Sequence, residues 1–188
     1  RASDVLDLLE QVRDHGDKIA FRYYVGKEIK DLTYGQFYTM VYECAAAFDA
    51  MGLKGKRVAV IGCPGGGKST FSRALRERVG LPLYHLDAIY WREDRTHLSR
   101  EEFYPLMREI IAREEWIIDG NYGSTVEWRI AACDILFFLD YPAEVCLAGV
   151  RARRGQKRSD MPWVEEGDDE EFLDFIRAFE SESRPRIL

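Results

Sequence analysis

The segment Gly62-Cys63-Pro64-Gly65-Gly66-Gly67-Lys68-Ser69 is the most informative stretch of this chain. It fits the pattern G-x-x-x-x-G-K-[ST], in which a glycine-rich turn joins a buried strand to a helix. The flanking sequence supplies that context, because the apolar run 57–61 precedes the turn and a helical pattern from about residue 69 to 79 follows it. The glycines let successive backbone N–H groups face a polyphosphate, and the helix adds its positive N-terminal end. The segment therefore predicts a phosphate-binding loop.

The residues of this loop have separate expected tasks. Lys68 is expected to reach the β- and γ-phosphates of ATP, and the Ser69 hydroxyl is expected to bind Mg²⁺. The other residues expected to surround the nucleotide phosphates are Gly62, Pro64, Gly65, Gly66, Gly67 and Thr70. A plain glycine turn is the alternative, and the flanking strand and helix patterns disfavour it.

Short apolar runs alternate with helical patterns after the loop. Residues 81–86, 116–118 and 135–139 are apolar runs typical of buried strands. Helices are predicted around residues 125–132 and from Ser99, where Ser99-Arg100-Glu101-Glu102 fits a capping box. The alternation predicts an α/β fold in three layers, with a parallel sheet covered by helices on both faces.

The region before the loop has another organisation. Helical spacing at residues 5–12 and 34–51 flanks a predicted β-hairpin over residues 19–33, whose turn is Gly26-Lys27. We therefore predict an appendage of helix, β-hairpin and helix over residues 1–56, followed by the α/β domain over residues 57–188.

Length and composition narrow the class of protein. The chain has 188 residues, of which 46% are apolar and 32% charged, a balance typical of a globular domain with a packed core. No apolar run approaches the roughly 20 residues that span a bilayer, and the N-terminus shows no apolar signal core. We expect a cytoplasmic protein without a membrane partner. Four widely spaced cysteines form no metal motif, and a net charge of −6 makes nucleic acid an unexpected partner.

From residue 57 onward the chain resembles the small P-loop kinases related to adenylate and shikimate kinases, in particular the group often labelled topology-modulation proteins. The resemblance is carried by the loop, by residues 85–91 (HLDAIYW), 117–122 (IIDGNY) and 138–142 (FLDYP), and by Arg151 and Arg154. It implies a fold like that of nucleoside-monophosphate kinases, the use of ATP and Mg²⁺, and a small-molecule phosphate acceptor. Such kinases carry a further helix and a fifth strand, so we expect a kinase domain that is truncated at its C-terminus.

Two carboxylates follow predicted strands, at the sheet edge where open α/β sheets bind ligands. The resemblance implies that Asp119 holds Mg²⁺ through water, and that Asp87 faces the acceptor, where it orients or deprotonates a hydroxyl. It also implies that Arg129 binds the acceptor. A helix cap or turn residue is the alternative for either aspartate. Tyr122 is expected to line the acceptor pocket, with a place in the core or at its rim as the alternative.

The basic run 151–158 resembles the lid of adenylate-kinase-like enzymes. Arg151 and Arg154 are the expected lid arginines, which neutralise charge during phosphoryl transfer. A solvated helix end and a nucleic-acid patch are the alternatives. The acidic run 165–171 disfavours the patch, because it follows closely and opposes the local positive field.

Residues 1–60 resemble another family, the AMP-forming acyl-CoA synthetases. The resemblance is carried by residues 17–21 (DKIAF), 32–35 (LTYG) and 45–60. The adenylation loop and the later catalytic motifs of those ligases are absent, so no ligase activity is expected. The chain is therefore interpreted as a chimera joined through the strand that precedes the phosphate loop.

Together these patterns predict an ATP- and Mg²⁺-dependent phosphotransferase that acts on a nucleotide or another small metabolite. Two alternatives stay open at this point. One is a nucleotide-binding regulatory or DNA-associated protein without kinase turnover, and the other is a chimeric fold that binds nucleotide but is inactive. The acceptor group is open between a phosphate and a hydroxyl, and the oligomeric state is open as well.

Overall fold

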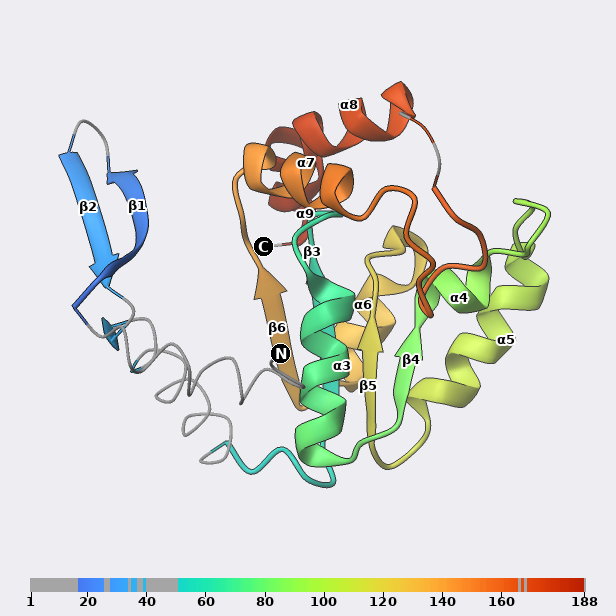
Figure 1. Ribbon diagram of the computed structural model, residues 1–188. Helices are drawn as coiled ribbons and strands as arrows, with labels where there is room; N and C mark the ends of the chain where they lie inside the picture. The colour runs from blue at the N-terminus through green and yellow to red at the C-terminus, as the bar shows by residue number, and fades with distance from the viewer. Residues whose placement is uncertain are drawn as a thin grey trace. The chain divides into compact units, whose positions relative to one another are not determined.

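The structure is a computed structural model that describes residues 17–25, 28–33, 35, 36, 39, 51–165, 167 and 169–187. The chain divides into two compact units, Arg1–Leu53 and Lys54–Leu188 (Figure 1). The sequence prediction places the junction at residue 56.

The first unit contains an antiparallel hairpin of strands β1 (Ile19–Val25) and β2 (Glu28–Thr33). Its register runs from Val25 opposite Glu28 to Ile19 opposite Thr33. The predicted hairpin is therefore confirmed, and its content of aromatic and β-branched residues explains it. The predicted helix at residues 5–12 lies outside the described residues, as does most of the predicted helix at residues 34–51.

The second unit contains a parallel sheet of β3 (Arg57–Gly62), β4 (Leu83–His85), β5 (Trp116–Asp119) and β6 (Ile135–Leu139). The strand order is β4-β5-β3-β6, so β3 has a neighbour on each side. Val58 of β3 pairs with Ile117 of β5 and with Ile135 of β6. The phosphate loop therefore leaves the sheet from an inner strand.

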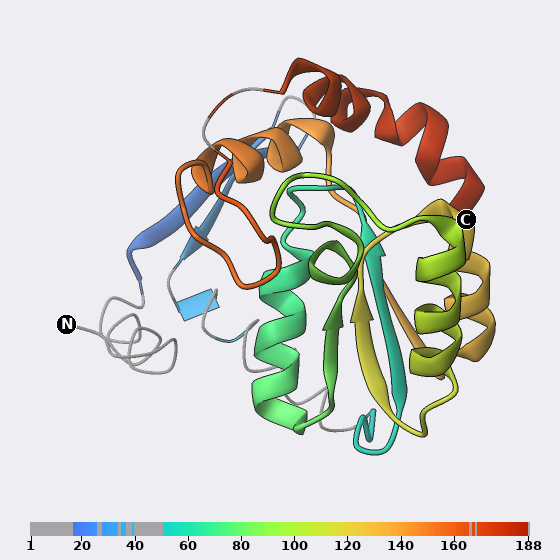
Figure 2. The ribbon, with the colours of Figure 1, turned by 90° about the vertical axis from the view of Figure 1, so that its right-hand side faces the viewer.

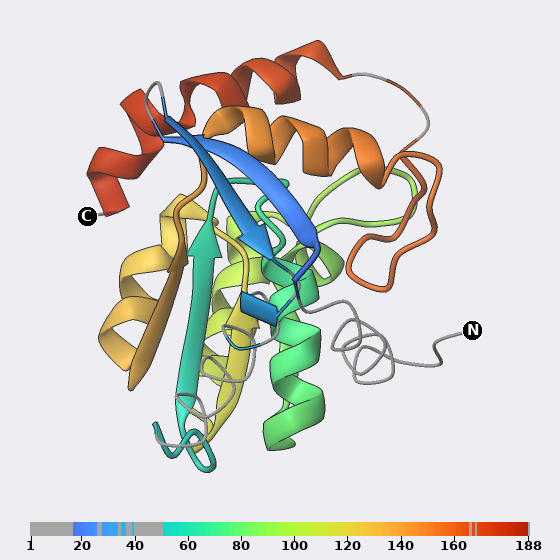
Figure 3. The ribbon, with the colours of Figure 1, turned by 60° about the vertical axis from the view of Figure 1, so that its left-hand side comes forward.

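Helices cover both faces of this sheet. Among the described residues of the second unit they are α3 (Lys68–Val79), α4 (Leu86–Tyr90), α5 (Arg100–Ile111), α6 (Gly123–Ala132), α7 (Ala143–Ala152), α8 (Glu170–Ala178), the π-helix η1 (Phe179–Ser183) and α9 (Arg184–Ile187). Helix α3 lies on one face, and α5 and α6 lie on the other (Figure 2). Helices α7 and α8 lie beyond the carboxyl ends of the strands (Figure 3). The predicted three-layer α/β class is confirmed.

Local signals explain several of these boundaries. At the start of α5, Glu102 N donates to Ser99 Oγ at 3.3 Å and Ser99 N donates to Glu102 Oε2 at 2.8 Å, which confirms the predicted capping box. At the start of β3, Arg57 donates through its backbone N–H and its guanidinium to Asp134, which directly precedes β6. No helix in the described part of the chain is long and apolar enough to span a membrane.

Candidate active site

A cleft of about 1640 Å³ opens beside the phosphate loop. The predicted site residues that line it are Pro64, Gly65, Gly67, Lys68, Ser69, Thr70, Asp87, Tyr122 and Arg154. The lining formed by the described residues does not include Gly62, Gly66, Asp119, Arg129 or Arg151. The structure thus brings the loop, Asp87 and part of the basic run to one cleft.

Asn121 fixes the first residue of the loop. The N–H of Gly62 donates to Asn121 Oδ1 at 3.0 Å, and Asn121 Nδ2 donates to the carbonyl of Gly62 at 2.8 Å. This contact follows from the sheet, because Gly62 ends β3 and Asn121 follows β5, the strand beside it. Sequence reasoning assigned Asn121 no role, although its place just after a strand was a signal.

Helix α7 supports the loop through direct backbone contact. Gly65 has φ +85°, and a Cβ added there would overlap the carbonyl of Cys146 in α7. A Cβ added at Gly149 would overlap the carbonyl of Gly65. The loop and α7 approach this closely only because neither Gly65 nor Gly149 carries a side chain.

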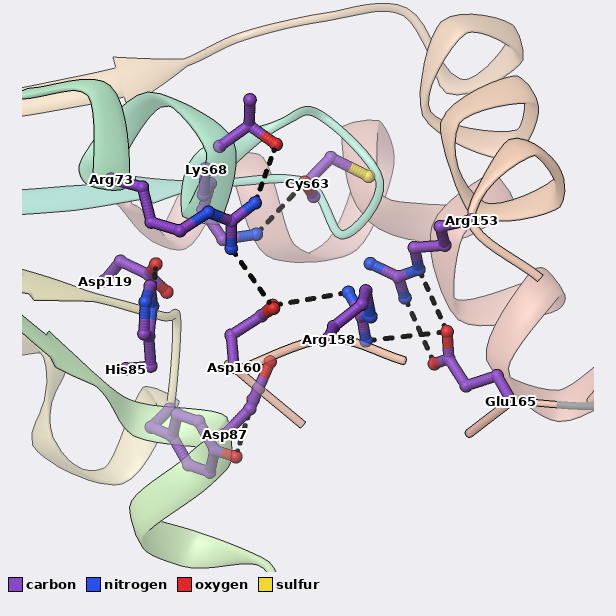
Figure 4. Close-up of polar contacts among 12 residues, drawn as sticks. Cys63, Lys68, Arg73, His85, Asp87, Asp119, Arg153, Arg158, Asp160 and Glu165 are labelled. Atoms are coloured by element: carbon purple, nitrogen blue, oxygen red, sulfur yellow. Dashed lines mark hydrogen bonds and ion pairs between the residues drawn. The ribbon is translucent and has the colours of Figure 1, made fainter. Parts of the chain in front are cut away.

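The amine of Lys68 lies within the curve of the loop. Its Nζ donates to the carbonyls of Gly62 at 3.0 Å and Cys63 at 3.2 Å (Figure 4). Burial lowers the pKa of this amine, and the carboxylates of Asp119 and Asp87 oppose that shift. The amine is therefore held where the pattern of the loop requires a cation for phosphate.

Asp87 and Tyr122 form a hydrogen-bonded pair on the cleft wall. The Tyr122 hydroxyl donates to Asp87 Oδ1 at 2.8 Å. Burial raises the pKa of Asp87, although the bond from Tyr122 and the charge of Lys68 oppose the shift. Burial also raises the pKa of Tyr122, so its hydroxyl keeps its proton. A carboxylate with a raised pKa in a cleft is suited to take a proton from a hydroxyl.

Asp119 ends β5 and is only 2% exposed. Its Oδ2 lies 2.7 Å from Nδ1 of His85, the last residue of β4 (Figure 4). The two side chains therefore hold the ends of neighbouring strands together beneath the cleft. A role for Asp119 in holding Mg²⁺ through water stays a prediction.

The oxygen atoms beside the phosphate loop are of the kind that Mg²⁺ takes as ligands. Ser69 lines the cleft at the first turn of α3, and hydroxyl and carboxylate oxygens are the ligands this ion prefers. Within the described ranges, no three His, Cys, Asp or Glu side chains gather into a metal site. Mg²⁺ commonly binds through few protein groups, substrate phosphates and several waters. The residues present therefore fit an ion that enters with a nucleotide.

Arg129 belongs to the core and not to the cleft. Its side chain is 0% exposed and donates to the backbone carbonyls of Gly120, Asn121, Tyr122 and Thr125. Burial lowers its pKa to about 10, so the guanidinium remains charged at neutral pH. These N–H groups are used on the turn between β5 and α6, which disfavours the acceptor contact implied by the resemblance. Arg129 instead fixes the segment that carries Asn121 and Tyr122.

The basic run contributes more than the two arginines expected from it. Arg151 is exposed at the end of α7, whereas Arg154 lines the cleft. Arg153 and Arg158 line the cleft as well, and each contacts Glu165: Arg153 Nε lies 3.0 Å and Arg158 Nη2 lies 3.5 Å from Oε2. The sequence pattern did not distinguish Arg153 and Arg158 from their basic neighbours.

Asp160 lies among charged groups at the centre of the site (Figure 4). It is 2% exposed, and Arg73 Nη1 and Arg158 Nη1 each donate to it at 3.3 Å. Burial opposes its ionisation, but the charge of Arg158 and a hydrogen bond with the Ser69 side chain lower its pKa overall. Sequence reasoning missed both Arg73 and Asp160. The only signal was that Arg73 follows Ser69 by one turn of α3.

Aromatic side chains form another part of the cleft wall. The rings of Trp91 and Trp163, both in the lining, meet edge to face with centroids 5.6 Å apart. The guanidinium carbon of Arg95 lies 5.9 Å from the Trp163 ring centroid. Tyr90 instead packs against the core cluster beneath α5.

Comparisons with known proteins give no family. No family model matches the chain, and no curated protein matches it. A solved gluconokinase from Sinorhizobium meliloti 1021 is 18% identical, with 64% of this chain and 71% of that chain covered and a TM-score of 0.43. Deoxyadenosine kinase from M. mycoides with bound dATP is 13% identical, with 70% and 86% covered and a TM-score of 0.40. The same kinase with the products dCMP and a flexible dCDP is 14% identical, with 69% and 83% covered and a TM-score of 0.36.

These likenesses are too distant to assign a substrate to this chain. The comparisons give no support to the resemblance of residues 1–60 to acyl-CoA synthetases or to the chimera inferred from it.

Proposed function

We propose that this chain transfers the γ-phosphoryl group of ATP, with Mg²⁺, to a hydroxyl group of a small molecule. The observation that carries the proposal is that Lys68, on the phosphate loop, and Asp87, a carboxylate whose pKa burial raises, line the same cleft. A loop of this pattern binds a polyphosphate, and a carboxylate with a raised pKa can act as the general base that takes the proton of an acceptor.

In the proposed reaction, the acceptor oxygen bonds to the γ-phosphorus while the bond from phosphorus to the β–γ bridging oxygen breaks. ADP leaves with that electron pair, and Asp87 takes the hydroxyl proton. Tyr122 orients Asp87, and Lys68 offsets the charge on the transferring group. Mg²⁺, when bound, would offset the phosphate charge further, with Ser69 as its contact on the loop.

The pair of Asp87 and Tyr122 supports a hydroxyl acceptor. Asp87 lines the cleft, burial raises its pKa, and a carboxylate of this kind can take the proton that a hydroxyl loses when it is phosphorylated. Sequence reasoning left a phosphate possible because Arg129 was free to bind it. In the structure Arg129 lies in the core, where its N–H groups are used on backbone carbonyls.

The pairing of charges in the cleft disfavours the DNA-associated alternative. Arg153 and Arg158 are paired with Glu165 inside the cleft, so they do not form the open basic face that a DNA backbone requires. No ligase activity is proposed for the N-terminal unit.

The first test is a calorimetric titration with ATP and Mg²⁺ of the unaltered chain, of Lys68→Ala, and of Lys56→Ala as the matched control on an exposed lysine. Saturable binding that Lys68→Ala loses and Lys56→Ala keeps is expected. Release of ADP is then followed with hydroxyl compounds and with phosphate monoesters as acceptors. Absence of ATP binding by the unaltered chain would overturn the proposal, and ADP release with phosphate monoesters alone would overturn its hydroxyl part.

A further inference from the structure

Asp160 joins two parts of the second unit that are distant in sequence. It lies in residues 155–165, which we call the lid segment, and it contacts Arg73 of α3. On its other side Asp160 accepts from Arg158, within the lid segment itself. A carboxylate that is 2% exposed requires such partners, because burial of an unpaired charge is strongly unfavourable.

The contacts of Asp160 belong to a continuous polar chain (Figure 4). At its loop end, Arg73 Nη2 donates to Thr70 Oγ1 at 3.4 Å. The chain passes through Asp160 to Arg158, and from Arg158 to Glu165 at 3.5 Å. Glu165 then binds Arg153, directly after α7. The first turn of α3 is thereby linked to the basic run through one buried carboxylate.

The lid segment has a second attachment elsewhere in the cleft, where Trp163 meets Trp91 of the wall that follows α4. This contact is apolar and does not involve the phosphate loop. On the loop side, the lid segment is attached through the ion pair between Asp160 and Arg73.

The five charged side chains of this network carry one more cation than anion. Three guanidinium groups, Arg73, Arg153 and Arg158, face two carboxylates, Asp160 and Glu165. Arg153 Nε and Arg158 Nη2 are buried atoms that lie at ion-pair distance from Glu165 but have no hydrogen bond of good geometry in the described part of the chain. Phosphate oxygens are the acceptors that arginine binds best.

We propose that Asp160 is a positioning residue, which holds the lid segment on the phosphate loop and directs Arg73 and Arg158 toward a bound polyphosphate. Only the identity of the ligand, ATP, rests on the proposed function. The attachment of the lid segment is a property of the chain without nucleotide.

The test compares Asp160→Asn, which keeps the shape and removes the charge, with Asp134→Asn. The control is matched because Asp134 also pairs with an arginine, Arg57, at the opposite end of β3 from the loop. Hydrogen exchange of residues 155–165 is measured without nucleotide, and ATP affinity is measured with Mg²⁺. Asp160→Asn is expected to accelerate the exchange and to weaken ATP binding, each by about tenfold, while Asp134→Asn changes neither.

Thermal unfolding of both variants separates a local effect from loss of the fold. If Asp160→Asn does not fold, Arg73→Ala is used instead. It removes the ion pair with Asp160 by changing the more exposed partner, and it is expected to accelerate hydrogen exchange of residues 155–165 as well. In the Arg73→Ala background, Asp160→Asn is expected to weaken ATP binding by less than it does alone, because the two residues form one link.

Unchanged exchange in Asp160→Asn would overturn the attachment, and faster exchange with unchanged ATP affinity would overturn the positioning role. Fully additive effects on ATP affinity would overturn the link to Arg73. If the unaltered chain does not bind ATP, the proposed function fails, and with it the assignment of ATP as the ligand. The exchange comparison still decides whether Asp160 holds the lid segment.

Discussion

Asn121 and Gly62 exchange two hydrogen bonds, one in each direction, through the side-chain amide of one and the backbone of the other. The same Gly62 carbonyl also accepts from Lys68 at 3.0 Å. The residue that opens the phosphate loop is thus fixed by the segment after β5 and by the loop's own lysine. An amide is required at position 121, since the contact needs a donor and an acceptor on one short side chain.

Replacing Asn121 is therefore expected to loosen the loop. Asn121→Ala should weaken the binding of ATP with Mg²⁺ by about tenfold, because both backbone groups of Gly62 lose a partner. Asn121→Asp should weaken it at least as much, since a carboxylate cannot donate to the Gly62 carbonyl. Calorimetric titration gives both affinities, and binding within twofold of the unaltered chain in both variants would contradict the role of this contact.

Gly149→Ala is expected to displace the loop from α7. The new methyl group would overlap the carbonyl of Gly65, and relief of such overlap costs roughly 1–3 kcal/mol. ATP affinity should fall by about tenfold or more. The control is Val145→Ala in the same helix, where the side chain is 50% exposed and does not line the cleft. Equal affinities for the two variants would contradict direct support of the loop by α7.

The variant Arg129→Ala tests whether Arg129 has a structural role or binds the acceptor. Its loss leaves buried carbonyls without donors and opens a cavity, so the free energy of unfolding in urea should fall by about 3 kcal/mol or more. Arg108→Ala, which removes a guanidinium that lies over the Trp128 ring, should lower it by about 1 kcal/mol or less. A stable Arg129→Ala variant with only a raised KM for the acceptor would restore the role that the sequence implied.

The pKa of Asp87 is expected to set the acid limb of the pH profile of kcat/KM. Burial raises its pKa above the ordinary 3.8, so the acid limb of kcat/KM should lie above pH 3.8. The bond from Tyr122 opposes that shift, so Tyr122→Phe should move the limb to still higher pH. A limb that moves to lower pH in Tyr122→Phe would show that another group controls it.

The raised pKa of Asp87 also makes a prediction for stability. A carboxyl group with a higher pKa in the folded than in the unfolded chain stabilises the fold at low pH, and this contribution is lost as the pH rises through the folded value. At pH 7 Asp87→Asn should therefore be more stable to urea than the unaltered chain, while turnover falls by about 100-fold or more. A less stable Asp87→Asn would mean that the charged form is favoured by its surroundings.

Local patterns predicted the framework of the second unit well. The apolar run 135–139 coincides with β6, and the capping box at Ser99 marks the start of α5. These elements are predictable because their signals lie within a few residues of one another. Strand β4 is shorter than the apolar run 81–86, because Leu86 already begins α4.

The placement of individual arginines was harder to predict, for a physical reason. Arg129 and Arg153 have the same side chain, but one meets the carbonyls of a turn and the other meets Glu165 in the cleft. Which acceptors a guanidinium meets depends on contacts between distant segments. The pair of Arg73 and Asp160 spans 87 positions, and no local pattern contains it.

The backbone contact between Gly65 and Gly149 also limits where the lid segment can bend. With no side chain between them, the backbones of the phosphate loop and α7 are in direct contact. Bending within α7 would disturb that contact, whereas Gly155, which follows the end of α7 at Ala152, has φ +70°, a conformation that glycine adopts readily. We therefore expect the lid segment to bend at Gly155 and not within α7.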